Sequence, residues 1–459
     1  MTEYWNAELE TRAWREVEAW QAGRISKVLE PLRARSQMYA ELHADVPQAT
    51  FDRFEDLRSL PFTTKEDLRK ALDASSEEQS FGRNQAVALD DIVQCLSSSG
   101  TTGSPMYYPV TRNDVEMFAD AIAHNWFTAG VRREDVVAHL VGLPIVAGGL
   151  PYADGFRRIG ATLCWLGGLP TERILREMPR LRVTALLATT SFGLYLAEKW
   201  GGAGHEAGQA STLTKVLTGG EPGLGEPEIR ERIKRGLAIT QLRETMGMGD
   251  VIPGMWSECE VQDGMHFNAQ RYVAVELIDS ETDANIPWRE GAAGELVYTT
   301  FEREAAPVVR YRSRDHALVI GVNCACGRTS PRIRCIGRMD DMLIYRGMNV
   351  FPSSIREHIA RSFANEVEPV IRVWKVHADQ VRFDDPIAVD VEASPAFDLA
   401  HAETLAEAIE KEVRTHLQVC VAVRVLESGG LPKSIYKNAL VAVRDSTSSK
   451  TKDRGWAGS

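Results

Sequence analysis

Apolar residues between positions 90 and 300 occur in short runs that alternate with amphipathic segments. The short runs fit strands, and the segments between them repeat apolar residues at the three- to four-residue spacing of helices. The predicted strands are residues 135–143, 161–167, 183–189 and 213–220, and the predicted helices are residues 151–160, 171–181, 191–200 and 226–235. This alternation is typical of βαβ units, so we predict an α/β fold with mostly parallel β-sheets flanked by helices.

Other patterns precede and follow this alternation. Apolar residues, several of them tryptophans, recur at helical spacing among charges through about the first 45 residues, which predicts helices there. Thr63 or Thr64 is the predicted N-cap of a further helix, because acidic residues follow in its first turn. Residues 272–279 and 294–301 read as antiparallel strands, so the large domain should include a β-rich subdomain.

The pattern changes again within residues 336–359. Beyond this segment, short apolar runs surround one long amphipathic helix at residues 401–417, which indicates a compact α+β unit. We therefore predict a large N-terminal domain over residues 1–338 and a small, mobile C-terminal domain over residues 339–445. The polar residues 446–459 are predicted to be a disordered tail.

Composition and charge narrow the classes of function. The chain has 459 residues, of which 44% are hydrophobic and 25% charged, as in an ordinary globular protein. Its net charge is −11 and no sustained Lys/Arg cluster occurs, which argues against nucleic acid or an anionic membrane as a partner. The charged N-terminus lacks the apolar core of a signal peptide, and no apolar run is long enough to span a membrane, so we predict a cytoplasmic location.

The stretch SSSGTTGSP at residues 97–105 is rich in hydroxyls and glycine. It follows the strand-like residues 91–96 and precedes a segment that enters a helix. Backbone N–H groups and hydroxyls at such a bend suit phosphate oxygens, although stretches of this composition are more often flexible loops. No Walker A motif occurs in the chain, and Ser104 stands where a phosphate loop usually carries lysine.

Seven cysteines, an odd number, argue against a disulfide framework. Cys259, His266, Cys324 and Cys326 form a Cys₃His set, which is a common structural zinc shell. Four ligands leave no open position, so such a zinc would be structural. The alternative is that these are isolated buried cysteines, as we expect for the remaining four, which lie in or beside apolar runs: Cys95, Cys164, Cys335 and Cys420.

Taken in order, several segments resemble the adenylate-forming superfamily of acyl-CoA synthetases, and within it the phenylacetate–CoA ligase branch. The resemblance runs from about residue 30 to about residue 445. The segments that carry it are LPFTTKEDLR, SSSGTTGSP, GGLPYADGFRRIGAT, LTGGEP, GELVYTTF, APVVRYRSRD, CACGRTSPRI and GRMDDMLIYRGMNVFPSSIRE. The resemblance implies an enzyme that works in two steps. A carboxylate attacks the α-phosphorus of ATP to give an acyl-adenylate and pyrophosphate, and a thiol, usually that of coenzyme A, then displaces AMP.

The resemblance also implies a nucleotide site. The residues expected to hold the β- and γ-phosphates are Ser98, Ser99, Gly100, Thr101, Thr102 and Gly103. The residues expected to line or stack against the adenine are Gly220, Glu221, Pro222, Glu244, Thr245, Met246 and Gly247. Asp315 is expected to bond the ribose hydroxyls, and Arg338 to contact the ribose or a phosphate.

The remaining roles implied by the resemblance concern catalysis and the acid. Asp250 is expected to bind Mg²⁺, Lys437 to neutralise charge on the transferring carboxylate and phosphate, and Asp340 to act as the hinge of the small domain. The expected acid pocket comprises Val146, Ala147, Gly148, Gly219 and Gly247. The paired cysteine segments also look like the metal site of this branch.

The chain departs from the family pattern at several of these positions. Asp250 replaces a glutamate, which shortens the reach of the Mg²⁺ ligand by one methylene. Ser104 replaces a lysine, and SIYK stands where the family often has SEGK before the oxygen-neutralising lysine. Val146 occupies the place of a flat phenylalanine, so simple phenylacetate should leave a void that a bulkier acid would fill.

The sequence thus predicts an ATP-dependent acid–CoA ligase for an aromatic or bulky cyclic carboxylic acid, with ATP/AMP, Mg²⁺, coenzyme A and structural Zn²⁺ as cofactors. Two alternatives stay open. One is an adenylating enzyme that loads a carrier-protein thiol or an amine, and the other is a non-catalytic acyl-adenylate binder, suggested by the altered motifs. Because this branch often forms dimers, a homodimer is also an expectation.

Overall fold

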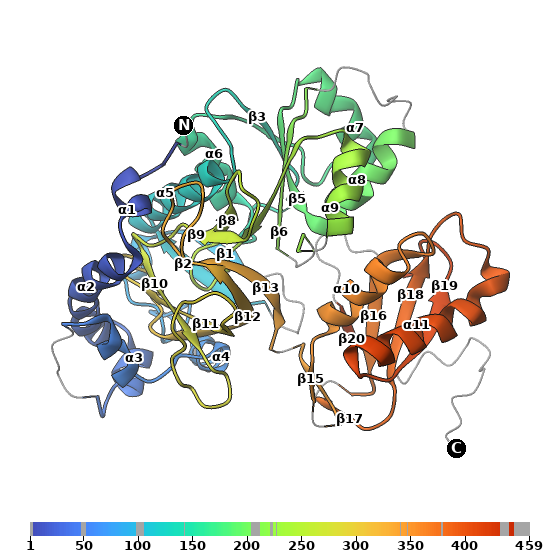
Figure 1. The fold of residues 1–459 in the computed structure, drawn as a ribbon. Helices are drawn as coiled ribbons and strands as arrows, with labels where there is room; N and C mark the ends of the chain where they lie inside the picture. Colours follow the sequence, from blue (N-terminus) through green and yellow to red (C-terminus); the bar gives the residue numbers. More distant parts are fainter. Residues whose placement is uncertain are drawn as a thin grey trace. The chain divides into compact units, whose positions relative to one another are not determined.

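The computed structural model describes residues 3–46, 52–97, 105–141, 143–202, 212–220, 224–225, 227–339, 341–346, 348–377, 380–431 and 440–444 (Figure 1). These residues form two compact units. The larger unit runs through Met339 and the smaller one begins at Asp341.

The large unit starts with helices that pack against its core. Thr64 is the N-cap of the fourth helix: its hydroxyl accepts from the Asp67 N–H, and the Asp67 carboxylate accepts from the Thr64 N–H at 2.8 Å. This reciprocal capping box confirms the predicted helix start. The N-terminal helices are α1 (Ala7–Thr11), α2 (Trp14–Arg35), α3 (Gln37–Leu42) and α4 (Lys65–Asp73), with short 3₁₀ turns at Phe54–Ser59 and Leu89–Asp91.

The predicted βαβ alternation is confirmed, and all strands of the alternation pair in parallel. The strands are β3 (Val136–His139), β4 (Thr162–Trp165), β5 (Ala185–Thr189), β6 (Lys215–Gly219) and β7 (Gln241–Met246). The helices around them are α5 (Arg112–Thr128), α6 (Leu150–Ile159), α7 (Thr171–Arg180), α8 (Thr190–Gly202) and α9 (Pro227–Leu237). Apolar residues of α7, α8 and α9 pack with β5 and β6 in one core cluster.

The β-rich part of the large unit is not a separate sheet. Its antiparallel strands continue the parallel half, so that the described residues form one sheet in the order β10-β11-β12-β13-β9-β8-β7-β6-β5-β3-β4. The added strands are β8 (Trp256–Glu258), β9 (Met265–Phe267), β10 (Val273–Ile278), β11 (Ala293–Thr300), β12 (Tyr311–Gly321) and β13 (Arg332–Arg338). A separate hairpin of β1 (Ile92–Ser97) and β2 (Tyr107–Thr111) carries the SSSGTTGSP segment between its strands.

The small unit has the predicted α+β character. Helices α10 (Pro352–Ser362) and α11 (Ala402–Leu417) share a core with its larger sheet, whose order is β19-β18-β16-β20. Its strands are β14 (Leu343–Tyr345), β15 (Met348–Val350), β16 (Val367–Lys375), β17 (Arg382–Phe383), β18 (Ile387–Ala393), β19 (Val421–Leu426) and β20 (Val441–Val443). None of the described helices of either unit combines the length and apolar character that a membrane span requires.

A buried ion pair fastens the N-terminal segment to the loop after β12. The Glu10 carboxylate accepts from Arg328 Nε at 2.6 Å, and both side chains are almost fully buried. Thr329 N–H donates to the Glu10 carbonyl, and the Tyr4 hydroxyl donates to the Cys326 carbonyl. Burial alone would raise the pKa of Glu10, but His124 and Arg328 lower it from 4.5 to about 2.

We predict that Glu10→Gln lowers the free energy of unfolding near neutral pH by about 3 kcal/mol, because Arg328 is left buried without its counter-charge. The Glu10 carboxylate has a lowered pKa, so its contribution is complete above about pH 4.5 and is lost as the pH falls towards 2. The difference between wild type and variant, measured by urea unfolding at several pH values, should therefore shrink below pH 4.5. The exposed Glu8→Gln is the matched control, and equal effects of the two substitutions would contradict the assignment.

Candidate functional site

Two glycines and a threonine meet where β6 and β7 end. Gly219 and Thr245 are paired across these parallel strands, and a Cβ on Gly219 would lie 2.5 Å from the Thr245 carbonyl oxygen. Gly220 follows with a φ of +81°, a conformation that glycine adopts without strain. The carboxyl ends of parallel strands are where open α/β sheets bind ligands, so this edge is the place to look for a nucleotide.

The loop after β7 is packed tightly at this edge. A Cβ on Gly247 would lie 1.9 Å from the Pro253 carbonyl oxygen, which itself accepts from the Tyr152 hydroxyl at 2.9 Å. A Cβ on Gly249 would lie 2.9 Å from the Cβ of Ala147. The loop therefore touches the predicted acid-pocket segment through Ala147.

The acid-pocket segment is also tied to the end of β1. Ser97 N–H donates to the Ile145 carbonyl at 2.8 Å, and Ala147 N–H donates to the Ser97 carbonyl at 3.2 Å. Val146 is buried, and a Cβ on Gly148 would lie 3.2 Å from the ring of Tyr152. Residues 146–148 are thus held between the end of β1 and the loop after β7.

Asp250 is buried in that loop and its carboxylate is held on several sides. The Tyr108 hydroxyl of β2 donates to Oδ1 at 2.9 Å, and Lys65 Nζ at the start of α4 lies 3.9 Å from Oδ2. The hydroxyl of Tyr311 is also hydrogen-bonded to Asp250. Burial, and then the charge of Asp250, raise the pKa of Tyr311 well above its ordinary value. A buried carboxylate held in one orientation is a suitable Mg²⁺ ligand.

Arg303 holds the backbone of the same loop. Its Nη1 donates to the carbonyl oxygens of Asp250 and Val251, the latter at 3.1 Å, and its guanidinium lies 5.6 to 6.0 Å from the rings of Phe118 and Tyr108. Arg303 is 4% exposed, and burial lowers its pKa. The sequence offers no signal for this role, because Arg303 stands among charges that read as a solvated turn. Lys65 lies in the LPFTTKEDLR segment and Tyr108 shortly after SSSGTTGSP, but the sequence did not predict that either contacts Asp250.

Asp315 and Arg338 form a second polar group, in the antiparallel part of the sheet. They are paired residues of β12 and β13, and Arg338 Nη1 donates to Asp315 Oδ1 at 3.0 Å. Burial, followed by the charges of Asp315 and Glu244, raises the pKa of the Cys335 thiol. Asp315 and Glu244, at the end of β7, therefore lie around the same thiol, which brings the predicted ribose and adenine residues into one neighbourhood.

Several predicted site residues lie outside the described part of the chain: Ser98, Ser99, Gly100, Thr101, Thr102, Gly103, Glu221, Pro222, Asp340 and Lys437. Their roles stay predictions. Their described neighbours Ser97, Gly220 and Met339 end β1, follow β6 and follow β13, respectively.

The structure brings Cys259, His266, Cys324 and Cys326 together, with all ligand atoms within 4.8 Å of one another. The sulfurs of Cys259 and Cys324 are 3.8 Å apart, and the Cys326 sulfur is 3.5 Å from His266 Nε2. Two sulfurs bound to tetrahedral Zn²⁺ at about 2.3 Å are separated by about 3.8 Å, so the donor set fits this metal. The long sequence gap is closed because β9, which contains His266, pairs with β13.

The surroundings of this thiol cluster also suit a cation. Ser330 Oγ lies 3.4 Å from His266 Nδ1, the ring nitrogen that faces away from Cys326. Hydrogen bonds from Cys259 and Cys324, together with His266, lower the pKa of the Cys326 thiol well below its ordinary value. A thiolate is the form in which cysteine binds metals.

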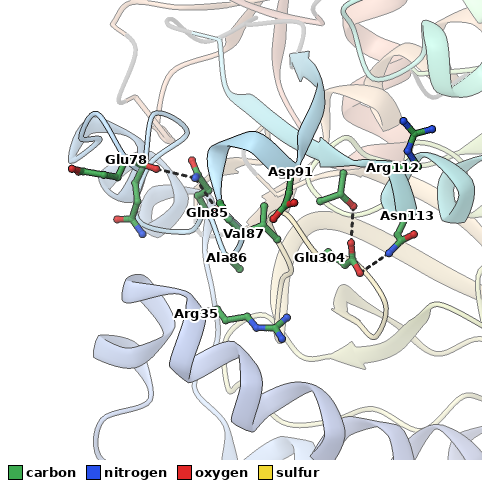
Figure 2. A pocket seen from close by; sticks show the side chains of 12 residues that line it. Arg35, Glu78, Gln85, Ala86, Val87, Asp91, Arg112, Asn113 and Glu304 are labelled. Carbon is green, nitrogen blue, oxygen red and sulfur yellow. Dashed lines mark hydrogen bonds between the residues drawn. The ribbon is translucent and has the colours of Figure 1, made fainter.

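An open surface pocket of about 600 Å³ lies elsewhere in the large unit and contains none of the predicted site residues (Figure 2). Its Glu304 accepts from Thr111 Oγ1 and Asn113 Nδ2, and its Gln85 donates to the carbonyls of Glu78 and Val87. These polar groups already bond one another, so the pocket is part of the scaffold around the start of α5.

Comparisons with known proteins agree with this geometry. A family model described as AMP-binding enzyme matches residues 18–300, and one described as AMP-binding enzyme C-terminal domain matches residues 347–444. Phenylacetate-coenzyme A ligase of Thermus thermophilus is 30% identical over 93% of this chain and 96% of its own length. The Escherichia coli protein of that name is 30% identical over 93% and 94%, respectively.

Among solved structures, a 2-hydroxyisobutyryl-CoA ligase in the postadenylation state in complex with 2-HIB-AMP is similar with a TM-score of 0.85. It is 25% identical, and the match covers 96% of this chain and 92% of that chain. The similarity therefore extends over both units.

We predict that Gly247→Ala lowers the free energy of unfolding by about 3 kcal/mol, because the new methyl group must displace the backbone at Pro253. Gly254→Ala in the same loop is the matched control, since its Cβ meets nothing closer than 3.5 Å. Urea unfolding of both variants checks this. An equal loss in both, or none in Gly247→Ala, would mean that the loop is not closely packed there.

Proposed function

Because the chain belongs to the AMP-binding enzyme family and is an AMP-forming acid–thiol ligase, we propose that it activates an aromatic or bulky cyclic carboxylic acid with ATP and passes the acyl group to coenzyme A. The observation that carries the proposal is that Gly219 and Thr245 are paired at the carboxyl ends of β6 and β7 and that the loop after β7 contains the buried Asp250. A cytoplasmic location and a homodimer stay predictions.

In the first step, the carboxylate of the acid attacks the α-phosphorus of ATP, and the bond to pyrophosphate breaks. Asp250 is proposed to hold Mg²⁺, which neutralises phosphate charge when bound. The two tyrosines and Lys65 keep the Asp250 carboxylate in place. Lys65 also supplies a positive charge beside this carboxylate.

The nucleotide is proposed to lie along the strand ends. Gly220 and the Glu244–Gly247 segment line the adenine, and the absence of a side chain at Gly220 and Gly247 leaves the backbone accessible there. Asp315 accepts from the ribose hydroxyls, and Arg338 keeps this carboxylate oriented through its hydrogen bond.

The acid is proposed to lie against residues 146–148. Val146 is smaller than the phenylalanine that the resemblance expects at this position, so a substituted aryl or alicyclic acid fills the space better than phenylacetate. In the second step the coenzyme A thiolate attacks the acyl carbon, and AMP leaves.

The experiment that tests the function combines the purified chain with ATP, Mg²⁺, coenzyme A and a panel of carboxylic acids, followed by mass spectrometry. We expect an acyl-CoA thioester and AMP with aryl or alicyclic acids. Acid-dependent pyrophosphate release without any thioester would point instead to a carrier-protein thiol or an amine as acceptor. No pyrophosphate release with any acid would contradict the proposal and favour an acyl-adenylate binder.

We predict that Lys437→Ala lowers the rate of acyl-adenylate formation by at least about a hundredfold, because a charge that stabilises the transferring oxygens is lost. Thioester formation from pre-formed acyl-AMP should remain largely intact, since no bond to phosphorus forms or breaks in that step. Pyrophosphate release and thioester formation are measured separately. Equal losses in both steps would show that Lys437 has another role.

The thiol cluster is proposed to bind one structural Zn²⁺, which would join the β8–β9 hairpin to the loop after β12. Metal analysis of the purified chain should then give about one equivalent at this cluster, and Cys324→Ser should remove it and lower the melting temperature. Cys164→Ser, outside the cluster, is the control. Full stability of the metal-free protein would overturn this assignment.

A further inference from the structure

Three further metal-ligand side chains meet in the small unit, away from the thiol cluster in sequence. His358 belongs to α10, and Glu412 and His416 stand one turn apart on α11. His358 Nε2 lies 3.3 Å from Glu412 Oε1, and His416 Nδ1 lies 3.1 Å from the same oxygen. One ligand atom from each residue lies within 4.8 Å of the other two.

These separations are those of atoms around a common cation. Ligand atoms bound at about 2.0 to 2.1 Å in tetrahedral geometry are about 3.3 Å apart, and both measured distances to the carboxylate fall close to this value. Two imidazoles and one carboxylate suit Zn²⁺ and the similar divalent ions Ni²⁺ and Cu²⁺. Three protein ligands leave at least one position for water.

The buried imidazole lacks a satisfying partner within the described residues. His358 is 5% exposed, and its Nε2 makes no hydrogen bond of acceptable geometry despite the nearby carboxylate. A buried ring nitrogen without a partner costs stability, which a bound cation would recover.

Two neighbouring side chains compete with a cation for the atoms of His358 and Glu412. Arg361 Nη2 lies 3.0 Å from His358 Nδ1, and Ser362 Oγ donates to Glu412 Oε1 at 3.2 Å. An imidazole that binds a cation through Nε2 carries its proton on Nδ1, so Arg361 must then turn away. Arg361 is exposed and can do so without unpacking the core.

We propose that His358, Glu412 and His416 form a second divalent metal site, of the Zn²⁺ class, that fastens α10 to α11 within the small unit. Binding replaces the contact between Arg361 and the buried ring by a metal bond. The site therefore ties together two helices of the small unit and shares no residue with the thiol cluster.

The test is a titration of the full-length chain with Zn²⁺ alone, followed by calorimetry and metal analysis. Wild type and Cys324→Ser are compared, because loss of the thiol cluster leaves the proposed site intact. Cys324→Ser should still bind one equivalent, and adding His416→Ala should weaken that binding by at least about tenfold. His416 is exposed, so its removal should not prevent folding, and the exposed His401→Ala is the matched control.

Arg361→Gln gives a second, opposite readout. It removes a cation and a donor that compete for His358, so Zn²⁺ should bind severalfold more tightly than in wild type. Unchanged binding in His416→Ala, or an absence of binding in Cys324→Ser when wild type binds one equivalent, would overturn the proposal. If Cys324→Ser does not fold, the proposal requires that wild type binds two equivalents of Zn²⁺ and that the single variant His416→Ala binds one.

Discussion

The buried guanidinium of Arg303 connects the two halves of the large sheet at the candidate site. It stands between β11 and β12 in the chain, yet it donates to the carbonyls of Asp250 and Val251 in the loop after β7. Because the charge is almost fully removed from water, it depends on these carbonyls, on the rings of Tyr108 and Phe118, and on the negative charges of Asp114 and Asp250. The position of the Asp250 carboxylate, and hence of the proposed metal and phosphates, depends on this contact.

A second link between the two halves of the sheet lies at β8 and β9. Short three-residue strands β8 and β9 extend the parallel half into the antiparallel half, and the ends of that bridge carry Cys259 and His266. The loop that completes the thiol cluster is also fastened to the N-terminal segment by the Glu10–Arg328 pair. A structural metal there would hold the bridge, the loop and the N-terminal segment together.

The sequence pattern was sufficient to predict the elements that have strong periodicity or clear capping residues. Strands β3 to β6 and helices α6 to α9 appear where the periodicity places them, whereas β7 was not predicted; Thr64 caps its helix as its hydroxyl and Asp67 predict. It was not sufficient for the continuity of the sheet, because three-residue strands carry too few positions to show alternation. Nor could it reveal Arg303, since a buried charge and a solvated one look alike until the aromatic rings and carbonyls around them are known. The residue types of the thiol cluster could be read from sequence, whereas their meeting depends on the pairing of β9 with β13.

The central claim is that a buried, oriented Asp250 carboxylate supports the attack of an acid on ATP. The most direct measurement is acid-dependent pyrophosphate release as a function of Mg²⁺ concentration in wild type and Asp250→Asn. The amide oxygen can still accept from Tyr108, so the loop should keep its structure while the negative charge is lost. We predict that Asp250→Asn needs about tenfold more Mg²⁺ for half-maximal pyrophosphate release and that its rate of release at saturating Mg²⁺ is lower. The same Mg²⁺ dependence and the same maximal rate in both proteins would contradict it.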